Sequence, residues 1–330
     1  MPAVTGIPDT ILIAPDSFKG TFSSFEVADT LAAGLTAGGW KVDPCPVADG
    51  GEGTLEVLRD AFDAELVTAE VTDPLGRRIE AAFGLGERAA IIATSAASGL
   101  GLIEPSERDP IAASTTGTGE LISAAIDAGA GTVYLGVGGS ATTDGGAGAV
   151  KAIRAGGGLR GARLVVLSDV RTPFEEAARV FGPQKGADPD QVGQLSKRLH
   201  AMARRLERDP RGVPMTGAAG GLSGGLWAAL DAELVAGAAF VLDALEFDRR
   251  MRAARAVVTG EGKLDLQSLG GKLISEVATR ARQAGVPCHA VVGTRELDSF
   301  GARILDLQVV LEASNADAIR SAGRELGDLI

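Results

Sequence analysis

Residues 11–26 read ILIAPDSFKGTFSSFE, and this stretch contains the pattern that decides the fold. The apolar run 11–14 has the length of a buried strand, and the Pro-Asp-Ser turn after it would end that strand. Ser23 and Glu26 then have the spacing of a capping box, which opens a helix. The apolar residues of this helix recur on one face, at Val27, Leu31 and Leu35. The stretch predicts a strand, a polar loop and a helix, in that order.

The same alternation continues outward from this stretch and returns in the last third of the chain. Gly38 and Gly39 end the first helix, and a second strand is predicted over 41–47. Near the other end, strands at 256–259, 287–292 and 307–311 alternate with helices near 271–284 and 315–328. Parallel strands joined by crossover helices pair most simply in one sheet. We therefore expect a doubly wound, mostly parallel, Rossmann-like sheet made from both ends of the chain.

The middle of the chain has a different pattern. Two apolar runs at 66–71 and 78–83 flank Asp73-Pro74-Leu75-Gly76, which is a turn signature of antiparallel strands. Further strands are predicted at 89–93, 132–137 and 163–167, with helices at 119–128, after Asp144 and after Asp188. The fold class is therefore predicted as α/β with two domains. Residues 1–60 and 250–330 form the Rossmann-like domain, 61–249 form an inserted mixed α/β domain, and the cleft between them is expected to hold the site.

Composition narrows the classes of partner. The chain has 330 residues and a formal net charge of −11, which argues against nucleic acid or an acidic membrane surface as a partner. Cys45 and Cys288 have no CxxC spacing, and the first residues lack the pattern of a signal peptide. These features predict a reduced, cytoplasmic protein that acts on a small molecule. The 46 glycines gather after apolar runs, where tight turns and close approach to a ligand both favour glycine.

Four loops combine glycine with acids, hydroxyls or lysine, at 15–20, 49–54, 138–146 and 260–265. Three of them follow a predicted strand and precede a predicted helix, where backbone N–H groups are available to bind phosphate. No GxxxxGK[ST] run and no GxGxxG fingerprint after a strand is present, so neither a P-loop kinase nor a standard dinucleotide enzyme is indicated. His200 and His289 lie in a predicted helix and a predicted strand and are interpreted as structural.

Phosphoryl transfer needs cationic groups for phosphates, carboxylates for Mg²⁺ and a group that orients the attacking hydroxyl. Lysines beside glycines and acids in turns supply candidates for each role. Any one lysine could instead be a solvated surface charge, and any one aspartate could bond only its own turn. The lysines are Lys19, Lys185, Lys263 and Lys272, and the acids are Asp16, Asp49, Glu52, Asp144, Glu261 and Asp265. On the residues alone, a binding protein fits almost as well as an enzyme.

The sequence motifs of these loops, and their order along the chain, match those of a known family. The motifs are APDSFKG, ADGGEGT, DPLGR, a P-x-x-R-x-P stretch, TTGTGELI, GGSAT-x-DGG, FGPQKGA, GAAGGL and TGEG-x-LD-x-QS-x-x-GK, between about residues 11 and 293. The chain resembles the bacterial class I glycerate kinases. That resemblance implies two α/β domains, ATP and Mg²⁺ as co-substrates, and phosphorylation of D-glycerate, commonly to 2-phosphoglycerate.

The resemblance also implies site residues by matching position. The catalytic set is Asp49, Asp265 and Lys19, with Asp49 and Asp265 as the acids near Mg²⁺. The amides of 138–142 are expected near the glycerate carboxylate. The substrate- and phosphate-binding set is Asp16, Ser17, Gly50, Gly51, Glu52, Gly139, Ser140, Thr142, Lys185, Glu261 and Lys272. A homodimer stays open, as do the hydroxyl that accepts the phosphate and the identity of the general base.

Several positions depart from the family pattern. Ala93 stands where Glu is usual, Thr143 where Asn is usual and Lys263 where Arg is usual, and the segment between 148 and 181 is shorter. Polar groups near a site read substrate hydroxyls, so these changes bear on specificity. A kinase for a related small hydroxy acid is therefore an alternative. A catalytically weak homologue that binds a sugar acid is a second one.

Overall fold

The structure is a computed structural model that describes residues 9–18, 20–270 and 272–330. The chain divides into two compact units. Unit 1 contains Met1–Asp49 and Ala238–Ile330, and unit 2 contains Gly50–Gly237. These limits precede the boundaries expected at 60/61 and 249/250. Helix α2 (Thr54–Ala61) packs on strands of unit 2, and helix α10 (Phe247–Arg252) contributes Phe247 and Met251 to the core of unit 1.

Unit 1 is built on a five-stranded parallel sheet. Its strands are β1 (Thr10–Pro15), β2 (Lys41–Pro44), β9 (Ala256–Leu264), β10 (Cys288–Arg295) and β11 (Leu307–Glu312), in the order β11-β10-β9-β1-β2. The opening strand β1 lies between β2 and β9, in register from Ile11 opposite Ala256. The two ends of the chain therefore share one sheet, which confirms the predicted doubly wound arrangement.

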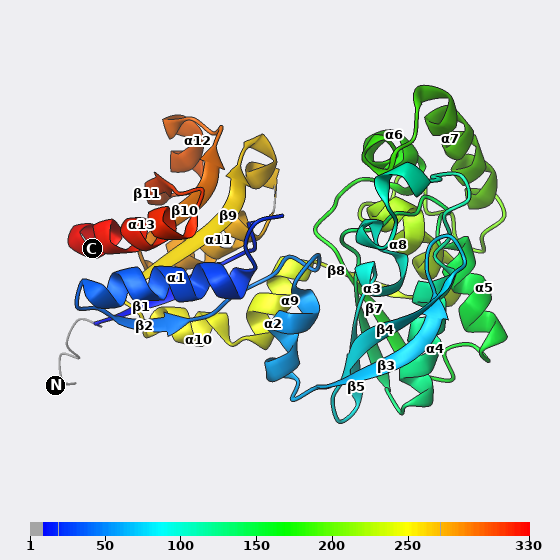
Figure 1. Cartoon of the computed structure of the whole chain (residues 1–330), viewed down its shortest axis with the longest axis horizontal. Coiled ribbons are helices and arrows are strands. Elements are labelled where there is room, and N and C mark those ends of the chain that lie inside the picture. The colour runs from blue at the N-terminus through cyan, green and yellow to red at the C-terminus, as the bar shows by residue number, and fades with distance from the viewer. Residues whose placement is uncertain (1–8, 19, 271) are drawn as a thin grey trace. The chain divides into compact units, whose positions relative to one another are not determined.

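Helices cover both faces of this sheet. Ile11 and Ile13 point toward α1 (Ser24–Ala37) and α13 (Ala316–Leu329), which lie side by side in Figure 1. Leu12 and Ala14 belong to the core on the opposite face, with α9 (Gly237–Ala244), α10 and α11 (Leu273–Ala284). Successive residues of a strand face opposite sides, so the apolar run of β1 supplies both cores. The remaining helices of this unit are α12 (Ser299–Ile304) and the 3₁₀ turn η5 (Leu266–Gly270).

Unit 2 is built on a mixed six-stranded sheet, as predicted. Its strands in spatial order are β3 (Glu65–Thr72), β4 (Arg78–Leu85), β5 (Ala89–Ala93), β6 (Thr132–Gly136), β7 (Arg163–Leu167) and β8 (Glu233–Val235). The first three strands pair antiparallel and the rest pair parallel. In the first hairpin, Asp73 accepts the backbone N–H groups of Leu75 and Arg77, which confirms the predicted turn.

Several helices of unit 2 belong to two hydrophobic clusters. Helices α4 (Thr116–Asp127), α5 (Ala147–Ala155) and α8 (Ala218–Leu230) share the main core of the sheet. Helices α6 (Ala177–Phe181) and α7 (Pro189–Ala203) pack around Phe174, and Asp188 and Gln191 form a capping box that opens α7. The short elements are α3 (Ser95–Ser98), η1 (Leu100–Leu102), η2 (Pro105–Glu107), η3 (Phe174–Glu176) and η4 (Pro183–Lys185).

The structure of two glycine-rich segments was not predicted from the sequence. The stretch 260–265 was expected to be a loop, but β9 continues through Gly260 to Leu264 because β10 pairs with it along that length. The segment 217–225 carried no prediction and lies in α8, which has a left-handed kink at Ala219, Gly220 and Gly221. A side chain at Gly220 would collide with the Thr142 carbonyl oxygen, so glycine permits this close approach.

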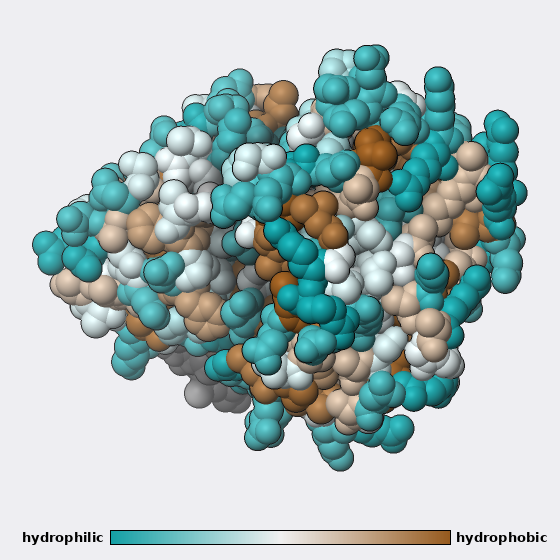
Figure 2. Space-filling view, turned by 45° about the vertical axis from the view of Figure 1, so that its right-hand side comes forward, coloured by the Kyte–Doolittle hydropathy of each residue, from teal (hydrophilic) through white to brown (hydrophobic). Residues whose placement is uncertain are grey.

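One face of the molecule is seen in space-filling view in Figure 2. Figure 2 shows hydrophilic residues over most of one face, with hydrophobic residues in smaller groups. Both cysteines are buried as free thiols, and burial raises the pKa of Cys45 to about 11 and that of Cys288 to about 12. No helix in the described residues combines the length and apolar character needed to cross a membrane.

Candidate active site

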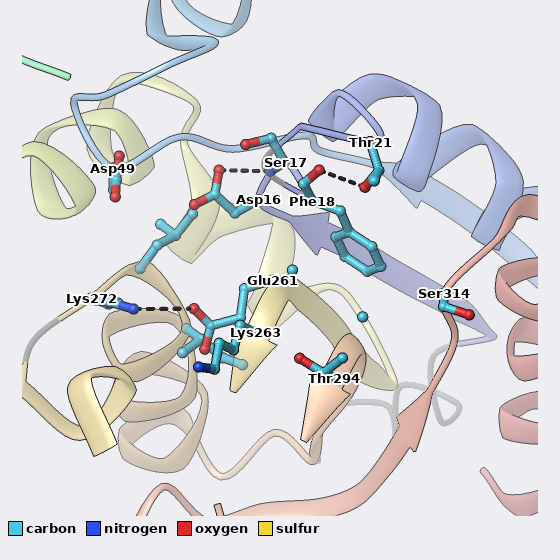
Figure 3. A pocket seen from close by; sticks show the side chains of 14 residues that line it. Asp16, Ser17, Phe18, Thr21, Asp49, Glu261, Lys263, Lys272, Thr294 and Ser314 are labelled. Carbon is cyan, nitrogen blue, oxygen red and sulfur yellow. Dashed lines mark hydrogen bonds and ion pairs between the residues drawn. The ribbon is translucent and has the colours of Figure 1, made fainter. Parts of the chain in front are cut away.

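A cavity of about 320 Å³ opens in unit 1 and collects many of the predicted residues. Figure 3 shows the carboxyl groups of Asp16 and Glu261 and the amine of Lys272 facing this cavity. Its lining consists of Asp16, Ser17, Phe18, Thr21, Asp49, Glu261, Gly262, Lys263, Lys272, Leu273, Ile274, Gly293, Thr294 and Ser314. The cavity therefore combines hydroxyls, carboxylates and lysines with a few apolar side chains.

The topology of the sheet explains why these residues meet. Parallel strands bring their carboxyl ends to one edge, which is where open α/β sheets bind ligands. The lining comes from the ends of β1, β2, β9, β10 and β11, and from the first turn of α11. Gly293 lies so close to Gly262 that an added Cβ would stand 2.5 Å from the Gly262 carbonyl oxygen. Adjacent strands can approach there only without side chains.

The loop after β1 is held by its own polar groups. Asp16 accepts the backbone N–H of Ser17 at 2.7 Å, and the Asp16 N–H donates to the Gly260 carbonyl at 2.9 Å. Both side chains are buried. The Ser17 hydroxyl has no hydrogen-bond partner among the described residues, so it is available to a ligand. Lys19, which was predicted to be catalytic, lies outside the described residues.

A second group of charges surrounds Lys272, the residue just before α11. Its Nζ lies 4.0 Å from a Glu261 oxygen and 3.8 Å from an Asp265 oxygen. Glu261 also accepts the Ser268 hydroxyl at 2.5 Å. Asp265 accepts the Gln267 N–H in a local turn and lies 4.0 Å from Lys263 Nζ. Lys272 is thus held at the cavity by two carboxylates at distances that leave room for a stronger anionic partner.

The acids of unit 1 are suited to binding Mg²⁺ together with the phosphates of a nucleotide. In the described part of the chain, no three His, Cys, Asp or Glu side chains cluster closely enough to hold a metal by themselves. Mg²⁺ is commonly bound by one or two carboxylates together with phosphate oxygens. Asp16 and Asp49, as oxygen donors lining one cavity, suit that mode. Asp265 does not line the cavity and is engaged with Lys272.

The predicted residues of unit 2 gather at the carboxyl ends of β5, β6 and β7. Lys185 is only 2% exposed, and its Nζ donates to Thr142 O at 2.5 Å and to Ser140 Oγ at 3.0 Å. Burial lowers the pKa of Lys185 to about 7, while the nearby Asp144 carboxylate acts in the opposite direction. Lys185 therefore ties η4 to the 138–144 loop, 45 residues earlier in the chain.

Asp144 organises the other end of this loop. Its carboxylate accepts the Thr115 hydroxyl at 2.9 Å and the backbone N–H groups of Thr115, Gly146 and Gly148, each at 3.0 Å. Every one of these donors is local to unit 2. The carboxylate is 2% exposed and satisfied by the protein, so its geometry suits a structural role in the loop.

The 50–52 segment packs backbone against backbone in unit 2. A Cβ on Gly50 would stand 2.8 Å from the Leu167 carbonyl oxygen, and a Cβ on Gly138 would stand 2.5 Å from Gly51 Cα. The side chain of Glu52 is exposed. Gly139 turns with a left-handed φ of 66° and accepts the Leu100 N–H. These contacts give Gly50 and Gly51 a packing role, and their binding of phosphate stays a prediction.

Sequence reasoning missed several lining residues of the cavity. Gly293 and Thr294 end β10, Ser314 follows β11, and Phe18 and Thr21 follow β1. The signal was available, because each follows or ends a predicted strand at the carboxyl edge. Their small or apolar side chains did not mark them as chemical groups, whereas the charged residues did stand out.

Comparisons with known proteins agree with this architecture. The model of the Glycerate kinase family matches residues 11–157 and 155–321. A Bacillus subtilis protein named glycerate kinase is 39% identical, over 88% of this chain and 86% of its own length. An Escherichia coli protein named glycerate 2-kinase is 36% identical, over 86% and 85%. A crystal structure from Salmonella typhimurium LT2, assigned as glycerate kinase 2, superposes with a TM-score of 0.80 at 34% identity and covers 98% of both chains. With its family motifs in place on a matching fold, the chain belongs to the glycerate kinase family.

Proposed function

We propose that this protein transfers the γ-phosphoryl group of ATP to a hydroxyl of D-glycerate, with 2-phosphoglycerate as the favoured product. In this reaction the glycerate oxygen forms a bond to the γ-phosphorus, the bond from that phosphorus to the ADP oxygen breaks, and the hydroxyl proton is lost. Family membership and the names of the relatives support a glycerate-phosphorylating enzyme.

The observation that carries the proposal is the cavity of unit 1. It combines Lys272, the unpartnered hydroxyl of Ser17 and the carboxylates of Asp16 and Asp49 at one edge of a parallel sheet. Phosphates need cationic and hydroxyl donors, and Mg²⁺ needs carboxylate oxygens. We assign Lys272 to the phosphates and keep the same assignment for Lys19.

Of the two acids predicted to be catalytic, Asp49 is the better placed for the chemistry. It lines the cavity, whereas Asp265 stands beside Lys272 and bonds its own turn. We therefore assign Asp49 to Mg²⁺ or to the attacking hydroxyl and Asp265 to positioning Lys272. When bound, Mg²⁺ would supply charge neutralisation on the phosphate oxygens. Asp49 would hold or accept the hydroxyl proton if it lies beside the acceptor.

The loops of unit 2 are proposed to hold the acid. In the 138–142 segment, which Lys185 fixes, the Ser140 hydroxyl and the backbone N–H groups other than that of Ala141, which donates to the Ser98 carbonyl, are proposed to bind the carboxylate. The expectation that the acid meets the nucleotide between the two units is part of this proposal. We also propose that the protein is cytoplasmic and that its partner is a small molecule. A homodimer stays a prediction.

One observation favours an alternative acid. Thr143 occupies a position where the family usually has Asn, and its buried hydroxyl has no partner among the described residues. A buried hydroxyl that is left unpaired can read an additional hydroxyl or carboxylate on a substrate. A related small hydroxy acid is therefore the second candidate for the acceptor.

The experiment is ATP consumption by the purified protein with Mg²⁺ and, in turn, D-glycerate, L-glycerate, tartronate and erythronate. Phosphorus NMR of the product identifies the hydroxyl that carries phosphate. Turnover of D-glycerate to 2-phosphoglycerate is the expected result. Turnover of another acid but not of D-glycerate would show that the substrate is that other acid. Binding of an acid without turnover would show that the protein is a binding protein and not an enzyme.

A further inference from the structure

Arg108 carries a charged group that no role described so far uses. It belongs to the P-x-x-R-x-P stretch, which the sequence singled out without a function. Its Nε is buried and has no hydrogen-bond partner among the described residues. The residue as a whole is partly exposed.

The neighbouring acids do not neutralise Arg108. Glu107 receives both of its bonds from Arg77, at 3.1 and 3.2 Å, and Asp109 accepts the backbone N–H groups of Ile111 and Ala112 at 3.0 Å. An arginine stays charged at every relevant pH. Both adjacent acids are engaged with other groups, and in the described part of the chain neither forms an ion pair with Arg108.

The aliphatic part of the Arg108 side chain lies near Gly186, in the turn that Lys185 connects to the 138–144 loop. Its Cβ and Cδ lie within van der Waals distance of the position that a Cβ on Gly186 would occupy, at 3.5 and 3.7 Å. Gly186 directly follows Lys185, whose amine bonds Ser140 and Thr142. Arg108 therefore packs against the same turn that fixes the loop proposed to hold the acid.

Other unpaired groups belong to the same loop system. Buried hydroxyls without a partner in the described residues occur at Thr142 and Thr143 of the loop, and at Thr94 after β5. The backbone N–H of Thr94 donates to the Gly136 carbonyl at the end of β6, which joins these two strand ends. Unpaired hydroxyls and an unpaired guanidinium in one unit match a ligand that carries both a carboxylate and hydroxyls.

We propose that Arg108 binds the carboxylate of the small hydroxy acid substrate through a two-point interaction with its planar guanidinium. This inference rests on the proposed function and assigns its acid specificity to one side chain. Arginine suits this role better than lysine because its fork of donors matches both oxygens of a carboxylate.

The test compares D-glycerate with its neutral analogue D-glyceramide, in the wild type and in the variants Arg108→Ala and Arg108→Lys. Binding is measured by calorimetry, and KM and kcat are measured for each co-substrate. We expect Arg108→Ala to weaken D-glycerate roughly 10- to 100-fold, with D-glyceramide and the KM for ATP changed less than threefold. The affinity of Arg108→Lys for D-glycerate should lie between those of the wild type and Arg108→Ala, because lysine keeps the positive charge but lacks the planar pair of donors of the guanidinium. Arg205→Ala is the control, since it removes an exposed arginine of the same unit.

Several outcomes would overturn the inference. Equal losses for the acid and the amide would mean that Arg108 supports the fold, and a raised KM for ATP instead would make it a phosphate ligand. If Arg108→Ala fails to fold, an unchanged D-glycerate affinity in Arg108→Lys decides against the inference. A wild type that does not phosphorylate D-glycerate contradicts the proposed function itself, which separates that failure from a failure at Arg108 alone.

Discussion

Two lysines, one in each unit, are held in opposite ways. Lys272 in unit 1 has a side chain that is 35% exposed, with carboxylate oxygens no nearer than 3.8 Å. Lys185 in unit 2 is buried and bonds a carbonyl at 2.5 Å and a hydroxyl at 3.0 Å. Both stand beside a glycine in sequence and both matched a family motif. The difference teaches that, of these two lysines, Lys272 has the more accessible amine, whereas Lys185 is committed to the 138–144 loop, which we propose holds the acid.

The strongest test concerns two acids of unit 1, Asp49 in the cavity lining and Asp265 beside Lys272. We expect Asp49→Asn to lower kcat at least ~100-fold, because the amide can neither accept the hydroxyl proton nor bind Mg²⁺ as well. Asp265→Asn should mainly raise the KM for ATP, since it loosens Lys272. Steady-state kinetics with ATP and D-glycerate measure both. Asp29→Asn, an exposed acid on α1, is the control. An unchanged kcat in Asp49→Asn would remove Asp49 from the chemistry.

The next test concerns Lys272 itself. Lys272→Met should raise the KM for ATP roughly 10- to 100-fold, because a charge-assisted bond to phosphate is worth about 1.5–3 kcal/mol. The KM for the acid should change little. Lys41→Met removes an exposed lysine of the same unit and serves as the control. A larger change for the acid than for ATP would reverse the roles that we assign to the two units.

Two glycines of unit 2 should respond in opposite ways when they are replaced by alanine, as judged by the free energy of unfolding. Gly138→Ala should lower the free energy of unfolding by ~1–3 kcal/mol, because its Cβ would stand 2.5 Å from Gly51 Cα. Gly193→Ala should raise it by ~0.5–1 kcal/mol, because this exposed position in α7 has open space around it. Urea unfolding of the two variants measures both. Equal effects would mean that the backbone at Gly138 moves aside.

The last expected effect, similar in size to that at Gly193, is a pH dependence at Lys185. The folded chain releases the Lys185 proton near a pKa of about 7, against an ordinary value of 10.5. Between these values unfolding takes up a proton, so this group makes the free energy of unfolding rise with pH. The rise from pH 7 to pH 8 should be about 1 kcal/mol in the wild type and absent in Lys185→Met. Lys151→Met, an exposed lysine of unit 2, should behave as the wild type does.

Much of the fold followed from local pattern. The strand at 11–14, the capping box at Ser23 and the helix start at Asp188 were predicted because their signals lie within a few residues. The extension of β9 through Gly260 and the kinked helix α8 were not, because pairing with β10 and contact with Thr142 override glycine-rich local sequence. Distant partners decide such segments, and no local pattern contains them.

The candidate site was predictable to a similar extent. The charged loop residues were found because acids and lysines beside glycine at strand ends are typical of phosphate sites. The role of Lys185 was not, since its partners Ser140 and Thr142 lie more than forty residues away. The lack of a partner for Arg108 Nε could not be predicted from the sequence either, because the sequence does not show that Glu107 and Asp109 bond other groups.

The packing of Gly138 against the 50–52 backbone also affects how this sequence can drift over generations. An apolar core position accepts many side chains, because a neighbour can change size in compensation. Where one backbone rests on another, there is no neighbouring side chain to shrink. Gly50 and Gly138 each lie under 3 Å from a backbone atom once a Cβ is added. These two positions should therefore tolerate fewer substitutions than the buried leucines, although they bury no apolar side chain.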